Sequence, residues 1–178
     1  MNLIKTTLAT ALLSVVASTA NAEFSQLPMW IELEEFNPGT RTYQGYKVEE
    51  CKHFHGVVDF CTNEAMKGMV AIANNKKPLM AGKYKVAIVD GLKLNDFGEK
   101  VSGFALIDTK AKKIITAPFE FLQGTRVTYN TKGQNTVYVY GDVSSVLNSN
   151  GIGNETTPVT ITYDPAEKTF FAKGIQYW

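Results

Sequence analysis

The sequence predicts an α+β fold: an antiparallel β-meander of six to eight strands with one helix at about residues 62–76. From Lys83 onward the chain consists of short runs rich in β-branched and aromatic residues, separated by turn sequences, which is typical of successive hairpins. One earlier segment has apolar residues at helical spacing. Strands joined by short turns pair antiparallel, so the hairpins predict a meander with the helix packed on or beside it.

The first 22 residues have the pattern of a secretory signal peptide. A short start with one positive charge, Lys5, precedes an apolar stretch at residues 6–16, and "ASTANA" at residues 17–22 has the small residues of a cleavage site. The apolar stretch is shorter than the roughly 20 residues that a membrane-spanning helix requires. We therefore predict cleavage after Ala22, export to the periplasm or the medium, and a single α+β domain at residues 23–178.

Composition limits the kinds of partner. The mature chain would keep 156 of the 178 residues, enough for one domain with a sizeable core, and would carry 17 basic and 17 acidic residues. Proteins that bind nucleic acids or anionic membranes usually show a basic excess or a basic stripe. The sequence shows neither, so we predict a protein partner, no nucleic acid and no membrane insertion. It leaves the oligomeric state open.

Two extended segments are expected before the helix. "MWIELEEF" (Met29–Phe36) should form the first strand, ended by the turn sequence "NPGT", and "RTYQGYKVEEC" should form the second. Thr62 or Asn63 would cap the start of the helix, and Pro78 would stop any continuation. The apolar positions that define the helix are Ala65, Met66, Met69, Val70 and Ala73.

The strands after the helix should form three hairpins, after a first apolar run, "KYKVAIVDG". The first hairpin includes "SGFALID" and turns at Asp108–Lys113. The second turns through Asn130–Asn135, where Gly133 can adopt a positive φ. The third turns at Asp164–Lys168, where Pro165 suits the second position of the turn.

Both cysteines and both histidines of the chain lie in one stretch, "CKHFHGVVDFC". In an oxidising compartment Cys51 and Cys61 should form a disulfide, and closing so short a loop stabilises a fold by roughly 2–3 kcal/mol in the chain-entropy model. A closed loop is pre-organised, so a partner that binds it loses less conformational entropy. The alternative is that the loop's apolar residues pack inward and its polar residues only contact solvent. The candidate binding residues are Lys52, His53, Phe54, His55 and Asp59.

The same stretch also contains the ligand types of a metal site. On an extended segment, His53 and His55 would face the same side, and Cys51 and Asp59 would add a thiolate and a carboxylate of the kinds that zinc prefers. The spacing matches no standard zinc module, and a disulfide would remove the thiolates. We therefore predict no metal and no cofactor.

No catalytic residues are predicted. A Ser-His-Asp or Cys-His system needs a base beside its nucleophile, and no serine lies in a G-x-S-x-G context. Asp90, Asp96 and Asp108 lie near expected strand ends, where acids are usually turn residues. The prediction is a protein that is not an enzyme, with an unrecognised hydrolase that uses these acids as an alternative.

The loop resembles that of Ivy-type exported bacterial lysozyme inhibitors. In that family a loop bracketed by cysteines begins Cys-Lys, contains a His and an Asp, and projects from an α+β scaffold into the active-site cleft of lysozyme. Cys51-Lys52, a histidine at 53 or 55, Asp59 and Cys61 are similar in kind, although the family's loop has four residues between its cysteines and this one has nine. The resemblance implies inhibition of a lysozyme through the loop and leaves open which histidine enters the cleft.

A second resemblance covers another part of the chain. "PLMAGKYKVAIV" followed by "GFALIDTKAKKIITAPF" is similar to a segment of small exported bacterial proteins without assigned function, which usually have Gly in the turn where this chain has Ala111. The leading hypothesis is thus an exported bacterial binding protein, in its sharpest form an inhibitor of a hydrolase such as lysozyme that acts through residues 51–61. The other hypothesis is an accessory or structural component of an envelope or secretion assembly, or a periplasmic immunity protein.

Overall fold

The computed structural model describes residues 36–145, 149–151, 153–154, 156–173 and 175–177. The predicted signal peptide and, apart from its last residue, the predicted strand Met29–Phe36 lie outside the described residues. All the helices and strands below belong to one unit, Asn37–Trp178. Among the described residues, no helix is long and apolar enough to cross a membrane.

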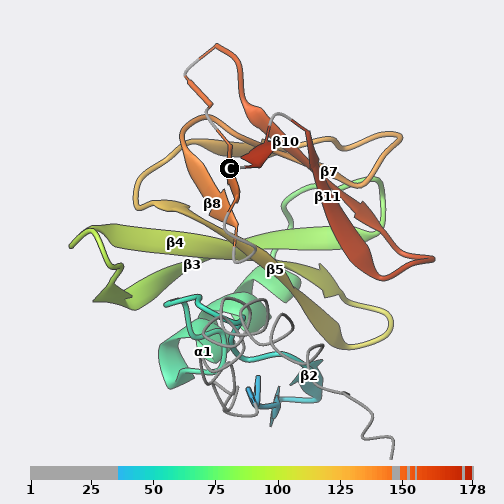
Figure 1. Ribbon diagram of the computed structural model, residues 1–178. Coiled ribbons are helices and arrows are strands. Elements are labelled where there is room, and N and C mark those ends of the chain that lie inside the picture. The colour runs from blue at the N-terminus through green and yellow to red at the C-terminus, as the bar shows by residue number, and fades with distance from the viewer. Residues whose placement is uncertain (1–35, 146–148, 152, 155, 174, 178) are drawn as a thin grey trace, which may run out of the picture. The chain divides into compact units, whose positions relative to one another are not determined.

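The described residues contain one helix and twelve strands, so the predicted α+β class with a single helix is confirmed (Figure 1). In chain order the elements are β1 Arg41–Tyr43, β2 Tyr46–Val48, α1 Asn63–Ala73, β3 Tyr84–Leu94, β4 Lys100–Asp108, β5 Lys113–Leu122, β6 Val127–Tyr129, β7 Thr136–Val139, β8 Val143–Ser145, β9 Ser149–Gly151, β10 Val159–Asp164, β11 Thr169–Lys173 and β12 Ile175–Tyr177.

Strand β5 is the centre of the larger of two sheets. It pairs antiparallel with β4 along one edge, and β4 pairs antiparallel with β3. Two strands share its other edge: β2 pairs in parallel with Lys113–Ile114, and β8 pairs antiparallel with Phe119–Phe121. The smaller sheet has the order β11-β10-β7-β6. The structure differs from a single meander because β2 joins β5 only after the chain has crossed through α1, β3 and β4, and such a crossover permits parallel pairing.

The larger sheet lies between α1 on one face and the smaller sheet on the other (Figure 1). On β4, Ala105 and Ile107 join the core cluster that includes the helix, whereas Phe104 and Leu106 join the cluster of the smaller sheet. Burial on both faces explains why "FALI" is a continuous apolar run instead of an alternating one.

Helix α1 begins at Asn63, directly after the predicted cap residue Thr62. The N–H of Ala65 donates to the hydroxyl oxygen of Thr62 at 3.1 Å, which satisfies one of the free donors of the first turn. Met66 and Met69 are fully buried on the face that packs against the larger sheet. The helix ends at Ala73, a little before the predicted end, with Asn74 as its C-terminal cap.

Two predicted hairpin turns have the same construction. In each, the carboxylate of an aspartate, Asp108 or Asp164, accepts hydrogen bonds from the main-chain N–H groups two and three residues later. The last loop residue is a lysine with positive φ, 56° at Lys112 and 54° at Lys168. The turn between β6 and β7 places Gly133 at a φ of 90°, as predicted. The turn at Asp164–Lys168 sets the direction of the Lys168 side chain, which lies in the candidate site described below.

The pairing of β5 with β4 contains an irregularity. The register passes from Ala105↔Thr116 to Gly103↔Glu120, so three residues of β5 face one residue of β4. One of the three is Pro118, and proline, which has no N–H to donate, is tolerated in sheets at bulges. On the opposite edge of β5, neither β2 nor β8 pairs with residues 115–118. The candidate site lies along this uncovered stretch.

Candidate functional site

The disulfide loop, residues Cys51–Cys61, is closed at its base as predicted. A disulfide joins Cys51 to Cys61, whose Cα atoms are 5.0 Å apart. Next to it, the N–H of Phe60 donates to the carbonyl of Cys51 at 2.8 Å. The N–H groups of Cys51 and Lys52 both donate to the carbonyl of Pro38. The two ends of the loop are therefore fixed to each other and to the segment before β1.

The second half of the loop is anchored by residues far away in the sequence. Val58 and Phe60 are buried in the core. The carboxylate of Glu120, on β5, accepts hydrogen bonds from the N–H groups of Val57 (2.7 Å) and Val58 (2.8 Å). Burial raises the pKa of Glu120, and these two N–H groups oppose the rise. Phe60 lies so close to Gly103 that a Cβ there would be 2.9 Å from its ring, so the position requires glycine.

The loop tip, which we define as Phe54 and His55, lies in the middle of a tight turn. The N–H of Gly56 donates to the carbonyl of His53 at 3.0 Å, and His55 has a φ of 62°. Glycine or asparagine usually takes such a position, because the left-handed conformation is unfavourable for other residues by roughly 1–2 kcal/mol. Both tip side chains are exposed, with their ring centroids 4.0 Å apart.

His53 points the opposite way. Its side chain is only 12% exposed, and its Nδ1 lies 3.4 Å from the carboxylate of Glu50. Its Nε2 is buried without a hydrogen-bond partner, and its ring meets the edge of Phe60. Burial lowers the pKa of His53 to about 4, outweighing the main chain of Thr116, which raises it. His53 and His55 do not face the same side, because the chain turns between them instead of continuing extended.

Lys52 and Asp59 face each other across the loop. The ammonium group of Lys52 lies 3.3 Å from the carboxylate of Asp59, and Asp59 also accepts a hydrogen bond from the N–H of Cys61 at 2.9 Å. Asp59 thus shapes the loop from within. Of the predicted binding residues, those that the loop exposes most are Lys52, Phe54 and His55.

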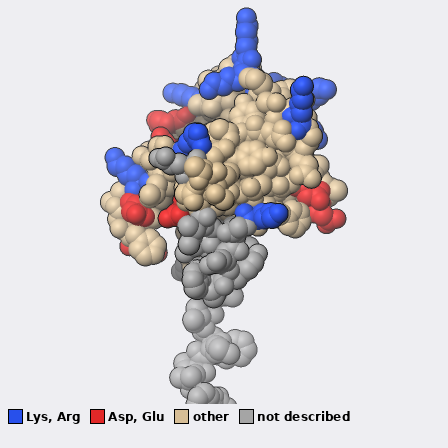
Figure 2. All heavy atoms as spheres, turned by 90° about the horizontal axis from the view of Figure 1, so that it is seen from above, with Lys and Arg blue, Asp and Glu red and all other residues tan. Residues whose placement is uncertain are grey.

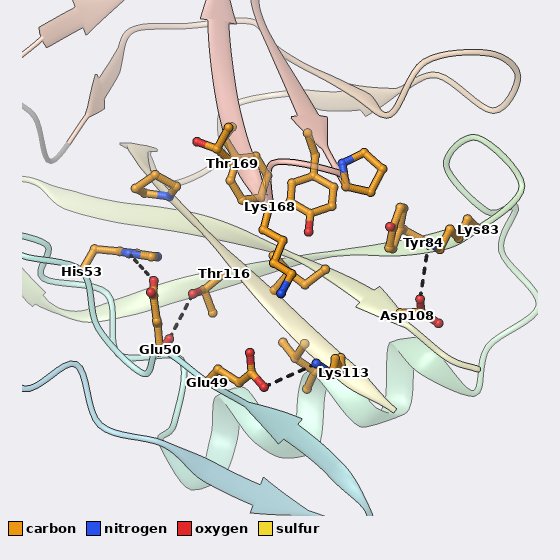
Figure 3. Close-up of a pocket in the computed structure, with 16 residues that line it drawn as sticks. Glu49, Glu50, His53, Lys83, Tyr84, Asp108, Lys113, Thr116, Lys168 and Thr169 are labelled. Carbon is orange, nitrogen blue, oxygen red and sulfur yellow. Dashed lines mark hydrogen bonds and ion pairs between the residues drawn. The ribbon is translucent and has the colours of Figure 1, made fainter. Parts of the chain in front are cut away.

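A pocket of about 510 Å³ lies beside the loop, over the uncovered stretch of β5 (Figure 3). This volume falls within the range of small-molecule sites. The pocket is bounded by the residues before the loop, by β5, by the paired ends of β3 and β4, and by the β10–β11 hairpin; His53 belongs to both loop and pocket. Its charged lining residues are Glu49, Glu50, Asp108, Lys83, Lys113 and Lys168.

Sequence reasoning did not identify Glu120 or the pocket. A signal for Glu120 existed, because it is the single acid in "APFEFL", between the buried residues Phe119 and Phe121. A carboxylate in such a run needs a buried partner. The pocket has no comparable local signal, because its walls come from four separate segments that meet only when the two sheets pack together.

The structure does not bring the three candidate acids into one site. Asp90 lies opposite Ser102 and accepts a hydrogen bond from its hydroxyl at 2.6 Å. Asp108 lies opposite Tyr84, which is six residues before Asp90 on β3, and this separation corresponds to roughly 20 Å of strand. Asp108 lines the pocket, whereas Asp90 and Asp96 do not.

The turn between His53 and His55 and the disulfide also bear on metal binding. Within the described part of the chain, no group of three or more His, Cys, Asp and Glu side chains is placed to hold a metal ion. Cys51 and Cys61 are joined in the disulfide, so they offer no thiolate.

The charged side chains on one face of the molecule are scattered. Figure 2 shows lysines and arginines, together with aspartates and glutamates, distributed around the edge of this face, with uncharged surface between them.

Comparisons with family models, curated proteins and solved structures found no match. What the fold and the site define is a class: an α+β protein that presents a disulfide-closed loop beside a pocket of mixed charge.

Proposed function

We propose that this protein is a non-enzymatic exported binding protein that engages a protein partner through the disulfide loop. Its contact residues are Lys52, Phe54 and His55, and in its sharpest form the partner is a hydrolase such as lysozyme. The observation that carries this proposal is the conformation of His55, left-handed at an exposed tip whose base and second half are both fixed.

The conformation of the tip supports recognition in two ways. Of the five described non-glycine residues with a positive φ, His55 is the one in the disulfide loop, and such conformations cluster at functional sites. The tip is therefore ordered before a partner arrives, which reduces the entropy lost on binding. Phe54, 44% exposed, supplies the aromatic surface that dominates many interfaces, and Lys52 adds charge beside it.

The resemblance to Ivy-type inhibitors supports the lysozyme version. In that family the histidine-containing loop enters the active-site cleft of the enzyme. The exposure of His55 favours it, over the buried His53, for this role. The nine residues between the cysteines would let the tip reach further than the shorter loop of that family.

Export is part of the proposal. The disulfide supports an oxidising compartment, and the sequence pattern supports cleavage after Ala22. Mass spectrometry of protein purified from its native source should find Glu23 as the first residue and no free thiols. Free thiols on Cys51 and Cys61 would contradict both the compartment and the fixed loop.

The direct test is inhibition by the mature, oxidised protein of a panel of lysozymes of different types, together with measurement of binding. We expect at least one enzyme to be bound and inhibited. Phe54→Ala and His55→Ala should each weaken binding at least about tenfold, as interface anchors do. Phe171→Ala is the matched control, because Phe171 is an exposed aromatic residue on β11, outside the loop.

Two outcomes would contradict the proposal at different levels. No binding to any lysozyme would remove the lysozyme version. Full potency of both tip variants against an enzyme that is inhibited would remove the loop from the mechanism. His55→Gly, which permits the same backbone conformation without the imidazole, separates the contribution of the side chain from that of the turn.

A further inference from the structure

We propose that the pocket beside the disulfide loop binds a small zwitterion, either a free amino acid or a short peptide with free termini. The ligand's carboxylate binds Lys168, and its ammonium group binds Glu50. This goes beyond the proposed function, because the site is separate from the exposed tip and its ligand is small.

Two of the three lysines in the pocket already lie beside a carboxylate. The ammonium group of Lys113 lies 3.5 Å from the carboxylate of Glu49, and that of Lys83 lies 3.9 Å from the carboxylate of Asp108. These pairs lie on the β5 side and at the paired ends of β3 and β4. Glu49 also pairs with Lys47, at 3.6 Å, so each of these pocket lysines already has a carboxylate beside it.

One acid and one base in the lining have no opposite charge of their own. Glu50 contacts His53, which is neutral near pH 7 because burial lowers its pKa to about 4. Among the described residues, no carboxylate forms an ion pair with the ammonium group of Lys168. The pocket therefore presents one uncompensated negative charge and one uncompensated positive charge, on different walls.

The hairpin turn directs Lys168 into the pocket. The left-handed φ of 54° at this residue ends the turn between β10 and β11, and Figure 3 shows the side chain extending from the hairpin toward Thr116 and Lys113 on β5. The lining also includes the apolar residues Ile115, Pro118 and Phe170. A ligand with charges at both ends and an apolar body matches this set of lining residues.

Ligands with a single charge match the pocket less well. A phosphate or other simple anion bound at Lys168 would share the pocket with Glu50, and a simple cation bound at Glu50 would share it with Lys168. Like charges at short distance are unfavourable. A zwitterion satisfies both free groups without bringing a net charge into the site.

The test is a titration of the ¹⁵N-labelled mature, oxidised protein with L-alanyl-L-leucine and with L-leucine, followed by NMR. N-acetylated and C-amidated forms of each serve as matched ligands. We expect millimolar binding with shifts of the amide signals of Thr116 and Thr169, and weaker binding when either terminus is blocked. Shifts with leucine alone indicate a free amino acid as the ligand, and shifts with the dipeptide alone indicate a peptide with free termini.

Variants assign the two ends of the ligand. Lys168→Gln should weaken binding by about two- to fivefold, as expected for a partly exposed ion pair, and should abolish the preference for a free over an amidated carboxyl. Glu50→Gln should likewise abolish the preference for a free over an acetylated amine. Lys173→Gln and Glu167→Gln, on the same hairpin but outside the lining, should leave both preferences unchanged.

Three results would overturn the proposal. They are the absence of shifts around the pocket at millimolar concentration, equal binding of blocked and free ligands, and binding of inorganic phosphate as tight as that of the dipeptide.

Discussion

The two halves of the disulfide loop face opposite environments, although one covalent bond closes both. The outer half, Lys52 to His55, exposes three of its four side chains, whereas the inner half, Val57 to Phe60, packs against the core and against Glu120. The disulfide fixes where the loop begins and ends. The conformation of the tip depends on the contacts of the inner half. Substitutions in the inner half should therefore change stability, and substitutions in the outer half should change binding.

The strongest test of this difference compares the stability of Phe60→Ala with that of Phe54→Ala. Phe60 is 1% exposed and Phe54 is 44% exposed. Removing a buried aromatic ring leaves a cavity, so Phe60→Ala should lower the free energy of unfolding by about 3–5 kcal/mol. Phe54→Ala should change it by less than about 0.5 kcal/mol. Urea unfolding followed by circular dichroism measures both, and equal losses would show that the two halves are not distinct.

The pH dependence of stability should separate the two histidines. In the unfolded chain His53 binds a proton near pH 6.5, but in the folded protein it does so only near pH 4. Acid therefore favours the unfolded state, and the free energy of unfolding should fall by roughly 2–3 kcal/mol as the pH decreases from 6.5 to 4. The contribution is fully present above pH 6.5.

The variants His53→Gln and His55→Gln isolate this effect. Because burial raises the pKa of Glu120, that residue contributes with the opposite sign, so curves should be compared between variants instead of read alone. The slope between pH 6.5 and 4 should decrease in His53→Gln and persist in His55→Gln. The same slope in both variants would mean that His53 is not held neutral in the folded protein.

Removal of the Glu120 carboxylate should release the inner half. In Glu120→Ala, the N–H groups of Val57 and Val58 lose their acceptor, and leaving such partly buried donors unpaired should destabilise the fold by about 1–3 kcal/mol. Glu120→Gln keeps a carbonyl oxygen and should lose less. Hydrogen exchange of these two amides should accelerate in the alanine variant, and unchanged exchange would contradict the role of Glu120.

The smallest expected effect is at the tip itself. His55→Gly relieves the left-handed strain, so the free energy of unfolding should rise by about 0.5–1 kcal/mol even though a side chain is lost. Phe54→Gly, one residue earlier and without a positive φ, should instead lower stability. Thermal unfolding of the two variants measures the sign, and a loss of stability in His55→Gly would show that its backbone is not strained.

Local patterns predicted the parts of the fold that local physics determines. The helix follows from apolar spacing and from the cap at Thr62, and the lysine turns follow from aspartates in turn positions. The parallel pairing of β2 with β5 did not follow, because Tyr46–Val48 is too short to show periodicity and its partner, Lys113–Ile114, lies more than sixty residues later. The irregularity at Pro118 likewise depends on which strand lies opposite.

The same division holds for the site. The pairing of Cys51 with Cys61 followed from their number and the expected compartment. The opposite directions of His53 and His55 did not follow, because they depend on a turn between them that the hydrogen bond from Gly56 to His53 closes. Lys168 had no signal for its role, since only the packing of the two sheets brings it into the same pocket as Glu50.

The dependence of the loop on Glu120 and Gly103 has a practical consequence for mimicry. A synthetic oxidised peptide of residues 51–61 would keep the disulfide-closed ring. It would lack the carboxylate of Glu120, which accepts from the N–H of Val58, and Gly103, against which the ring of Phe60 packs. Such a peptide would sample many backbone shapes in water. A faithful substitute would have to be grafted onto a scaffold with two paired strands, one carrying an acid and the other a glycine directly opposite it, as Glu120 and Gly103 are.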